Sequence, residues 1–435
     1  ADAEFFVTEA DKENLECTPV ATVAEHGRLR ISWRGKPVVD LSRAFLDTNG
    51  VQQSARVRVE APAPKSSPLG KAIPAAEQVE SLASGFRAIA SDLNLCSQKG
   101  LGEMFDGSVG AGTVLWPFGG RHQLTPVDAM AAKIPLLEGE TDTCTLMSWG
   151  FNPRIAQWSP YHGALFAVTE SVCRVVAAGG RLSDVRLTLQ EYFEKLGDDE
   201  TRWGKPFSAL LGAYHAQHAL RLAAIGGKDS MSGSFNELDV PPTLVSFAVA
   251  PSRASQTLSP EFKRSGSTIS LVSIPRDEHD RPDFERLRVV ADQLHELAAE
   301  GQILALHSLG EGGLAAGLLL MTLGNEIGFE AAPELKLSEC FPERYVSFLV
   351  ESPSALPPDL EARTIGRTVA APTVRIADES LQLSDLCNLW SAPLEGVYPQ
   401  SADSPHPEVE RFDWTGSPQI LRALELRARP RAVVP

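Results

Sequence analysis

Apolar and polar residues alternate near the start of the chain, and this pattern predicts β structure for residues 1–60. The stretch Arg28–Trp33 has the period of a half-buried strand, residues 35–36 suit a turn, and residues 38–39 open a second strand. A short helix is expected to end this part. Residues 61–71 are rich in proline, serine and glycine, which is typical of a linker or an extended surface segment.

Helix and strand patterns alternate along the rest of the chain. Helical periodicity or length is present in 82–95, 164–178, 207–220, 284–299 and 313–323. Apolar runs of strand length are present in 113–115, 143–149, 185–189, 243–250, 268–274 and 303–307. This order predicts an α/β (α+β) protein with two successive blocks, the second starting near residue 268.

A glycine-rich loop covers residues 105–113, with the sequence Phe-Asp-Gly-Ser-Val-Gly-Ala-Gly-Thr. Glycines such as Gly110 and Gly112 let backbone N–H groups approach a phosphate closely. A plain turn into the strand at 113–115 fits the same residues. No Lys-Ser or Lys-Thr pair follows at the spacing of a Walker loop, so this loop is not of that kind.

A second polar loop is expected at 226–233, between a helix and a strand. It places Lys228, Asp229 and Ser230 among glycines, and a lysine is a natural point charge for a phosphate. A polar turn that binds nothing is the alternative.

Residues 307–314 are expected to end one strand and to open a helix. Because helix N-termini attract anions, Ser308 and Gly310 are candidates for phosphate contacts. A tight strand-to-helix turn needs the same glycines, so this alternative stays open.

Two carboxylates are candidate ligands of a magnesium ion. Asp142 precedes an apolar strand, where a carboxylate can hold Mg²⁺, although a solvated turn residue also fits. Glu170 lies in a helix that is apolar nearly all round, and a buried carboxylate needs a metal or a partner. Arg174 follows one helical turn later and can be that partner, so metal ligand and structural ion pair both stay open.

Composition and charge narrow the classes of function. The chain has 435 residues, more than one ordinary core accommodates, and a formal net charge of −16 without a basic patch. This charge argues against nucleic acid but not against ATP, because metal ions and backbone amides neutralise phosphates. No apolar run is long enough for a membrane span, and the acidic start is unlike a signal peptide. The six scattered cysteines suit reduced thiols in a cytoplasmic protein.

Residues 1–60 have a counterpart near the other end of the chain. The short motifs at 6–9, 15–16 and 40–42 match those at 348–351, 360–361 and 382–384 in similar order and spacing. Each set is followed by a short expected helix. Residues 1–60 are therefore predicted to be the tail of a preceding copy of the unit that follows; two unrelated β-β-α tails are the alternative.

Several motifs, taken together, resemble one family. They are Gly-Leu-Gly-Glu-Met-Phe-Asp-Gly-Ser-Val-Gly from residue 100, Gln-Leu-Thr-Pro from 123, Trp-Ser-Pro-Tyr-His-Gly-Ala from 158, Gln-Glu-Tyr-Phe from 190, Trp-Gly-Lys-Pro from 203 and Gly-Gly-Lys-Asp-Ser-Met-Ser from 226. In this combination the chain resembles the large, single-chain phosphoribosylformylglycinamidine synthases over essentially its whole length.

The resemblance implies a domain organisation. Each unit of this family has two α/β subdomains like those of aminoimidazole ribonucleotide (AIR) synthetase, and the synthase carries two such units. By this resemblance, residues 1–60 are the tail of the first unit and 61–80 are a linker. The second unit then has its N-terminal subdomain at 81–255 and its C-terminal subdomain at 256–395, and 396–435 are a connector toward an absent glutaminase domain. A homodimer through the surface left by the missing first unit is a further expectation.

The resemblance also implies a reaction. The family consists of ATP-dependent carbon–nitrogen ligases of purine biosynthesis. ATP activates the amide oxygen of formylglycinamide ribonucleotide (FGAR) as an iminophosphate, and ammonia made from glutamine displaces the phosphate. The implied cofactors are ATP or ADP and Mg²⁺, and Asp142 and Glu170 match acidic metal positions. Some relatives have Asn in place of Arg174 and Asp in place of Ser308, which implies an altered or metal-free site.

Two alternatives stay open beside this reading. The chain can be a structural, nucleotide-binding half without chemistry of its own, or a stand-alone enzyme like AIR synthetase. As a fragment of the synthase, it is expected to be inactive alone, and its partners are then the missing first unit and the glutaminase domain.

Overall fold

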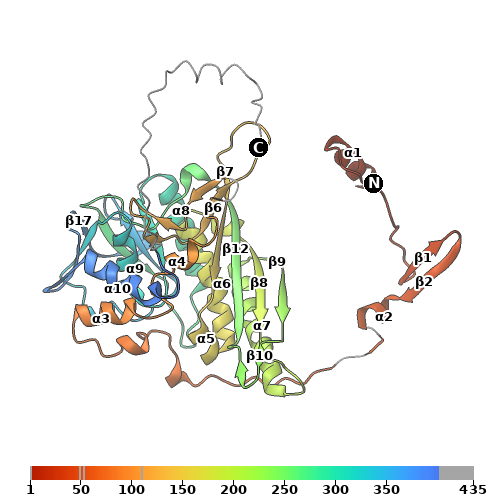
Figure 1. The fold of residues 1–435 in the computed structure, drawn as a ribbon, viewed down its shortest axis with the longest axis horizontal. Helices are drawn as coiled ribbons and strands as arrows, with labels where there is room; N and C mark the ends of the chain where they lie inside the picture. The colour runs from red at the N-terminus through yellow and green to blue at the C-terminus, as the bar shows by residue number, and fades with distance from the viewer. Residues whose placement is uncertain (1, 49, 52–53, 109–110, 401–435) are drawn as a thin grey trace, which may run out of the picture.

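The computed structural model describes residues 2–48, 50–51, 54–108 and 111–400. Its first segment contains helix α1 (Asp2–Lys12), the antiparallel strands β1 (Arg28–Trp33) and β2 (Lys36–Ser42), and helix α2 (Arg43–Thr48). The predicted hairpin and short helix are confirmed, whereas α1 is helical where β structure was expected. None of these elements has a buried residue, and Figure 1 shows the segment apart from the folded body.

A six-stranded mixed sheet forms one layer of the folded body. Its strands, in spatial order, are β3 (Thr113–Leu115), β6 (Met130–Lys133), β7 (Thr143–Gly150), β12 (Thr243–Arg253), β8 (Arg186–Tyr192) and β9 (Ala224–Ser230). Only β8 and β9 run parallel among these neighbouring pairs. Alternate residues of β7 and β12 are buried under helix α6 (Pro160–Ala177), on which α7 (Glu200–Leu220) packs.

A second sheet of seven strands forms the other layer. Its order is β14 (Ala305–Leu309), β16 (Ser347–Ser352), β13 (Thr268–Ser273), β17 (Arg363–Val369), β15 (Gly328–Ala331), β18 (Thr373–Ile376) and β19 (Glu379–Gln382). Strand β16 is buried along its whole length, because its two faces contribute to two different cores. This burial explains its continuous apolar centre.

The helices of the second block divide between these two cores. The apolar stripe predicted for α8 (Phe284–Ala299) is buried, and it packs against the helices of the six-stranded sheet. Helix α9 (Gly313–Leu323) is buried on the opposite face of the seven-stranded sheet, with α3 (Leu82–Ala90) and α10 (Leu383–Glu395). Helix α3 therefore belongs to the second core, although residues from 81 onward were expected to open the first subdomain.

Local sequence explains where several helices begin. Helix α6 begins earlier than expected because the side chain of Ser159 caps its N-terminus and Pro160 occupies its first position. Helix α7 begins at Glu200, capped by Asp199, and continues through Pro206. Helix α3 ends at Ala90 and is shorter than the expected 82–95.

The loop predicted at 226–233 is wrong for its first half, since residues up to Ser230 belong to strand β9. The shorter elements are α4 (Lys99–Gly102), α5 (Pro153–Trp158), β4 (Phe118–Gly119), β5 (Thr125–Pro126), β10 (Ser234–Phe235) and β11 (Leu238–Asp239). Within the described ranges, no helix combines the length and the apolar character that crossing a membrane requires.

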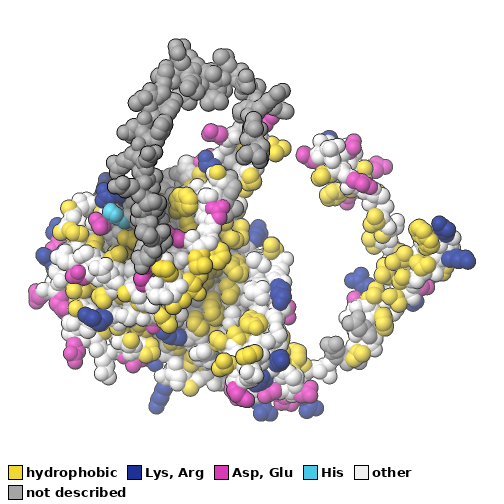
Figure 2. Space-filling view, viewed as in Figure 1, with side chains coloured by type: hydrophobic (Ala, Val, Ile, Leu, Met, Phe, Trp, Pro, Cys, Tyr) yellow, Lys and Arg dark blue, Asp and Glu magenta, His cyan; other side chains and the backbone are white. Residues whose placement is uncertain are grey.

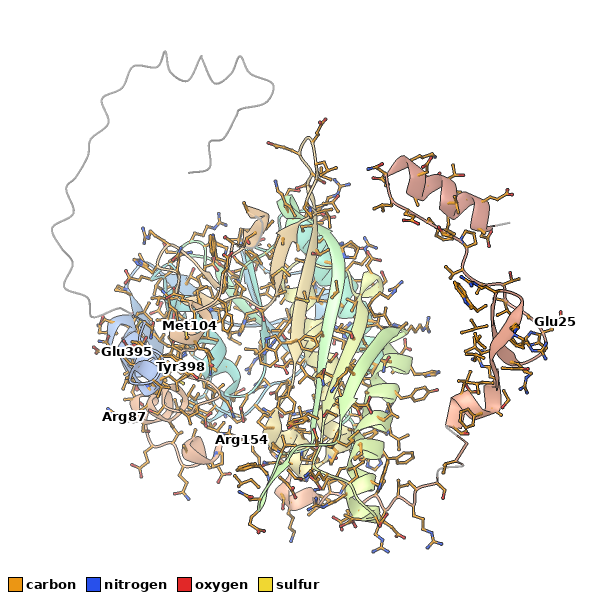
Figure 3. All side chains as sticks on the ribbon, turned by 45° about the vertical axis from the view of Figure 1, so that its right-hand side comes forward. Glu25, Arg87, Met104, Arg154, Glu395 and Tyr398 are labelled. Atoms are coloured by element: carbon orange, nitrogen blue, oxygen red, sulfur yellow. The ribbon has the colours of Figure 1, made fainter. Side chains whose placement is uncertain are left out.

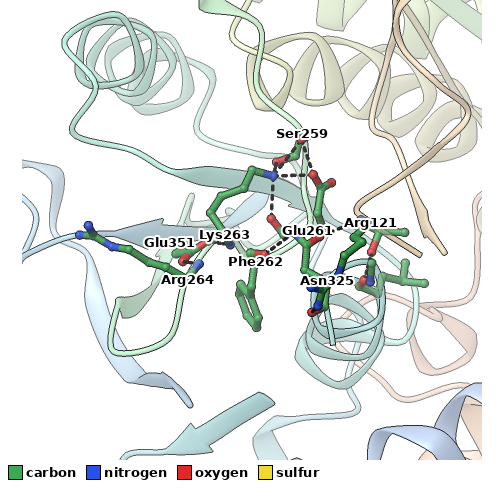
Figure 4. Close-up of polar contacts among 11 residues, drawn as sticks. Arg121, Ser259, Glu261, Phe262, Lys263, Arg264, Asn325 and Glu351 are labelled. Atoms are coloured by element: carbon green, nitrogen blue, oxygen red, sulfur yellow. Dashed lines mark hydrogen bonds and ion pairs between the residues drawn. The ribbon is translucent and has the colours of Figure 1, made fainter. Parts of the chain in front are cut away.

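A polar network ties the connector after β12 to strand β16 (Figure 4). The carboxylate of Glu351 accepts hydrogen bonds from the backbone N–H groups of Lys263 at 2.7 Å and Arg264 at 3.2 Å. The ammonium of Lys263 donates to Ser259 Oγ at 2.8 Å and to Glu261 Oε1 at 2.7 Å. Burial lowers the pKa of Lys263, and the charge of Glu261 opposes this shift.

Candidate functional site

The carboxylate of Glu170 is buried in the middle of α6, next to the end of β7. Its Oε2 accepts a hydrogen bond from the backbone N–H of Phe151 at 3.1 Å, and its Oε1 accepts one from Arg174 Nη2 at 2.6 Å. Burial raises the pKa of Glu170, and the positive charge of Arg174 opposes that rise. Both carboxylate oxygens therefore have a donor within the protein.

The guanidinium of Arg174 is held by Trp149 as well as by Glu170. Its Nη1 donates to the backbone carbonyl of Trp149 at 2.9 Å, and its central carbon lies 4.6 Å from the centre of the Trp149 ring. The side chain of Arg174 is 23% exposed, whereas that of Glu170 is 7% exposed. The cation thus reaches the surface while its partner carboxylate stays inside.

A second buried carboxylate, Asp128, joins the turn before β6 to strand β14. Its Oδ2 lies 2.9 Å from Nδ1 of His307, and its Oδ1 accepts a hydrogen bond from the backbone N–H of Ser308 at 3.3 Å. The negative charge of Asp128 contributes to the raised pKa of Glu170, which places the two carboxylates in one electrostatic neighbourhood.

Sequence reasoning selected Ser308 but missed Asp128. The available signal was an acidic residue two positions after the Gln-Leu-Thr-Pro motif and two positions ahead of a short strand. The pattern singles out Asp142, which directly precedes an apolar strand.

Gly310 brings the loop before α9 close to Glu170. A side chain at this position would begin 3.2 Å from the ring of Tyr345 and 3.8 Å from Glu170 Oε1. The hydroxyl of Tyr345 accepts a hydrogen bond from Asn152 Nδ2 at 2.9 Å, and burial raises the pKa of Tyr345. The structure therefore brings Ser308 and Gly310, from the segment before α9, close to Glu170 of α6.

Arg154, labelled in Figure 3, contacts two loops that border this region. From helix α5, its Nη2 donates to Asp92 Oδ2 at 2.6 Å, and its Nη1 donates to Glu311 Oε1. Burial raises the pKa of Glu311, and Arg154 opposes the rise. Asp92 follows α3 and Glu311 precedes α9, so one guanidinium connects three elements.

A cavity of about 290 Å³ opens beside these residues. Its lining includes Lys71, Arg154, Glu311, Glu343 and Tyr345. The volume is close to the lower end of the range that holds small ligands. Cations and carboxylates both line it, which suits a polar ligand with donors and acceptors.

Asp142 does not belong to this neighbourhood. Hydrogen bonds from Ser255 Oγ at 2.6 Å and from its backbone N–H at 2.9 Å lower the pKa of Asp142. Asp142 precedes the eight-residue strand β7, whereas Glu170 contacts the residue that follows it. At a rise of about 3.4 Å per residue, the two carboxylates lie roughly 27 Å apart along the strand and cannot share a metal ion.

The side chains near Glu170 do not fit a magnesium ion as they are arranged. Mg²⁺ requires several oxygen ligands in near-octahedral geometry, and the oxygens of Glu170 and Asp128 already accept hydrogen bonds. Across the part of the chain that the structure describes, no group of three or more His, Cys, Asp or Glu side chains is placed to hold a metal.

Lys228, Asp229 and Ser230 lie on the exposed edge strand β9. Across the sheet, Lys228 on β9 is paired with Gln190 on β8, and Gln190 is paired with Val245 on β12. The next residue of β12, Ser246, is paired with Gly150, the last residue of β7. This row is at the Glu170 end of the sheet. Three strand spacings of about 4.8 Å separate β9 from β7, so the lysine backbone is roughly 14 Å from that strand.

Of the two candidate glycines in the loop 105–113, the structure describes Gly112. Gly112 accepts a hydrogen bond from the backbone N–H of Lys133 at 2.7 Å, which fits a turn beside β6. Gly110 lies outside the described residues.

Comparisons with known proteins identify relatives with one shared description. No family model matches the chain. A Thermoplasma acidophilum protein described as phosphoribosylformylglycinamidine synthase subunit PurL is 27% identical over 371 residues, which cover 78% of this chain and 46% of the relative. The Deinococcus radiodurans PurL subunit is 25% identical over 457 residues, covering 89% of this chain and 55% of the relative.

Solved structures show the same fold at lower identity. T. maritima PurL complexed with AMPPCP has a TM-score of 0.53 at 13% identity, covering 79% of this chain and 57% of the other. T. maritima PurL complexed with FGAR has a TM-score of 0.53 at 13% identity, covering 78% and 57%. The chain spans about half the length of the curated relatives it matches. By sequence similarity and by fold, the chain is a distant relative of the PurL subunits of phosphoribosylformylglycinamidine synthase.

Proposed function

We propose that this chain is a component of a phosphoribosylformylglycinamidine synthase, namely the second AIR-synthetase-like unit of the large single-chain form, acting in the cytoplasm. The similarity to PurL subunits along most of the chain carries this proposal. The complete enzyme then amidates FGAR to the amidine, using ATP and glutamine-derived ammonia. We assign 61–80 to the linker, 81–255 and 256–395 to the two subdomains, and 396–435 to the connector toward the glutaminase domain. Helix α3 is an exception to this division, because it packs in the second core.

The proposed role of this unit is to bind a nucleotide at the Glu170 end of the six-stranded sheet. T. maritima PurL is complexed with ATP in one solved structure and with AMPPCP in another, which supports a nucleotide as the ligand class. Ser308 and Gly310 then border the phosphates beside Glu170, with Gly110 and Gly112 in the glycine-rich loop. Lys228, Asp229 and Ser230 supply an ammonium, a carboxylate and a hydroxyl from the sheet edge. Their role is then the positioning and charge neutralisation that serve phosphoryl transfer.

Residues 1–60 are proposed to be the tail of a preceding unit. The segment β1-β2-α2 has the same order of elements as β18-β19-α10, where a hairpin leads directly into a helix. In the second segment Val374, Ile376 and Trp390 are buried against the seven-stranded sheet and its helices. In the first, Ile31 is 47% and Trp33 is 66% exposed. These apolar side chains lack the sheet that covers their counterparts.

The outer face of the six-stranded sheet is proposed to contact that preceding unit, or a second copy of the chain in its absence. Met130, Met147 and Trp149 are each at least 40% exposed. Hydrophobic side chains gather over this part of the molecule in Figure 2. A contiguous exposed apolar face is typical of a protein–protein contact.

A nucleotide-binding half without chemistry is the second candidate. The fixed Glu170–Arg174 pair favours it, because a neutralised carboxylate cannot recruit the metal on which phosphoryl transfer depends. A catalytic role and a structural role for this half therefore predict different effects of Lys228→Met on turnover.

The test is phosphate release from ATP that depends on FGAR and ammonium, measured on the full-length protein that contains this chain. The proposal expects such turnover, and it expects none from residues 1–435 alone. Lys228→Met in the full-length protein should lower turnover if this half is catalytic, and should leave turnover intact while weakening nucleotide binding if it is structural. Absence of FGAR-dependent phosphate release from a folded full-length protein would contradict the proposed function.

A further inference from the structure

We infer that Arg174 is a built-in cation that excludes a divalent metal from the Glu170 site, so that any nucleotide bound there binds without Mg²⁺. This inference rests on the proposed nucleotide-binding role for its ligand, but its first half concerns only residues of this chain. Of the two alternatives for Glu170, metal ligand and structural ion pair, it takes the ion pair.

Arg174 occupies the position that a cation on Glu170 would take. A metal ion approaches a carboxylate oxygen to about 2.1 Å and needs its lone pairs free. Here Oε1 of Glu170 is 2.6 Å from the guanidinium, and Oε2 already accepts the N–H of Phe151. A divalent ion at Oε1 would also lie within a few ångströms of a fixed positive charge, which repels it.

The guanidinium is locked in place by contacts that are independent of Glu170. It donates to the carbonyl of Trp149 and stacks on the Trp149 ring, and the ring lies at the end of β7. Rotating Arg174 away would break three contacts and leave the buried carboxylate without its partner, which is strongly unfavourable. The free energy of binding a metal ion to Glu170 would have to exceed the free energy of these broken contacts.

The second carboxylate of the neighbourhood does not provide an alternative metal site. Asp128 is engaged by His307 and by the backbone N–H of Ser308. Position 308 contributes a hydroxyl rather than a further carboxylate, so the side chains around Glu170 offer little negative charge beyond what the protein already neutralises.

The exposed part of Arg174 explains how the site can still receive an anion. A guanidinium has five N–H donors in a planar fork, and the contacts above use one on Nη1 and one on Nη2. With 23% of its side chain exposed, Arg174 can present its outer edge to a phosphate oxygen. The charge that Mg²⁺ normally supplies to a phosphate then comes from the protein.

Manganese binding tests the first half of the inference without any nucleotide. Mn²⁺ is titrated into the purified chain and the free ion is followed by electron paramagnetic resonance. Any Mn²⁺ binding by the wild-type chain should persist in Glu170→Gln, because Glu170 is not expected to be a ligand. Arg174→Asn should gain at least a tenfold increase in affinity for Mn²⁺, and the double variant Arg174→Asn with Glu170→Gln should lose that gain. Arg288→Asn, at a surface ion pair on α8, is the matched control and should change nothing.

Two results of this titration would overturn the inference. The first is tight Mn²⁺ binding by the wild-type chain that is lost in Glu170→Gln. The second is an Arg174→Asn variant, shown to be folded by circular dichroism, that gains no Mn²⁺ affinity. If Arg174→Asn does not fold, the wild-type titration still decides between the two views.

Calorimetry of ADP with excess Mg²⁺ and with EDTA tests the second half. The inference expects affinities within about twofold of each other for the wild-type chain. A loss of ADP affinity of tenfold or more in EDTA would overturn it. Absence of ADP binding under both conditions would contradict the proposed nucleotide role instead, and the Mn²⁺ titration would then stand by itself.

Discussion

Glu191 on β8 and Asp229 on β9 are register neighbours in a parallel pair of strands, so two carboxylates project from the same face of the sheet. Burial, together with the charge of Asp229, raises the pKa of Glu191 to about 6. The proton on Glu191 is therefore held more tightly in the folded state than in the unfolded state.

This pair predicts how stability depends on pH. Because the folded-state pKa of Glu191 lies above its ordinary value of 4.5, the associated stability is present at low pH and is lost as pH rises through about 6. Glu191→Gln should therefore stabilise the chain at pH 7.5 by about 1–2 kcal/mol more than at pH 4.5. Urea unfolding at the two pH values measures this difference. Glu300→Gln, at an exposed helix end, is the control, and equal effects of the two substitutions would contradict the prediction.

Arg154→Met should destabilise the fold by about 3–5 kcal/mol, because Asp92 and Glu311 lose the one cation that both contact in this arrangement. Arg288→Met, which breaks a surface pair with Glu285, should cost about 1 kcal/mol or less. Denaturant midpoints of both variants check this. Similar losses of unfolding free energy in the two variants would mean that the contacts of Arg154 contribute no more than a surface ion pair.

Gly212→Ala tests the close packing of α6 on α7. A Cβ atom at position 212 would begin 2.0 Å from the backbone oxygen of Tyr161, so the helices must separate. We expect a loss of about 1–3 kcal/mol or more in the free energy of unfolding. At Gly396 the same change meets no atom within 4 Å, and its effect should stay within about 0.5 kcal/mol. A tolerated Gly212→Ala would show that the helices have room.

Lys228→Met should weaken ADP binding by about tenfold if the lysine contacts a phosphate, which corresponds to about 1.4 kcal/mol. Lys36→Met on the remote strand β2 should leave the affinity unchanged, since β2 belongs to the separate N-terminal segment. Calorimetric titration of ADP into the two variants makes the comparison. Equal affinities would remove Lys228 from the site and leave the Glu170 region to be tested alone.

The elements with a one-sided apolar pattern were predictable from sequence. Helix α8 follows its predicted bounds because its stripe is buried against other helices, and β7 follows from its alternating burial. Strand β9 was not predictable, because the Gly-Gly-Lys-Asp-Ser run lacks a strand pattern and pairs with β8 only through tertiary structure. Helix α1 was missed for a related reason, since its apolar residues pack on no core.

The resemblance to the synthase family is supported at the level of PurL, while the large single-chain form stays a proposal. Within the site, the spacing of Glu170 and Arg174 indicated an ion pair, but it did not decide between that pair and a metal. The structure contains the pair. Asp128 was missed because its partners, His307 and Ser308, lie 179 and 180 residues away in sequence, and such contacts carry no local signal.

Calorimetric titration of ADP into the purified wild-type chain is the decisive test of the proposed nucleotide site. We expect saturable binding of one nucleotide per chain, and ATP should compete with it. A folded chain, as shown by circular dichroism, that gives no heat of binding at about 1 mM ADP would contradict the proposed nucleotide site, because this concentration is far above the Kd of a working site.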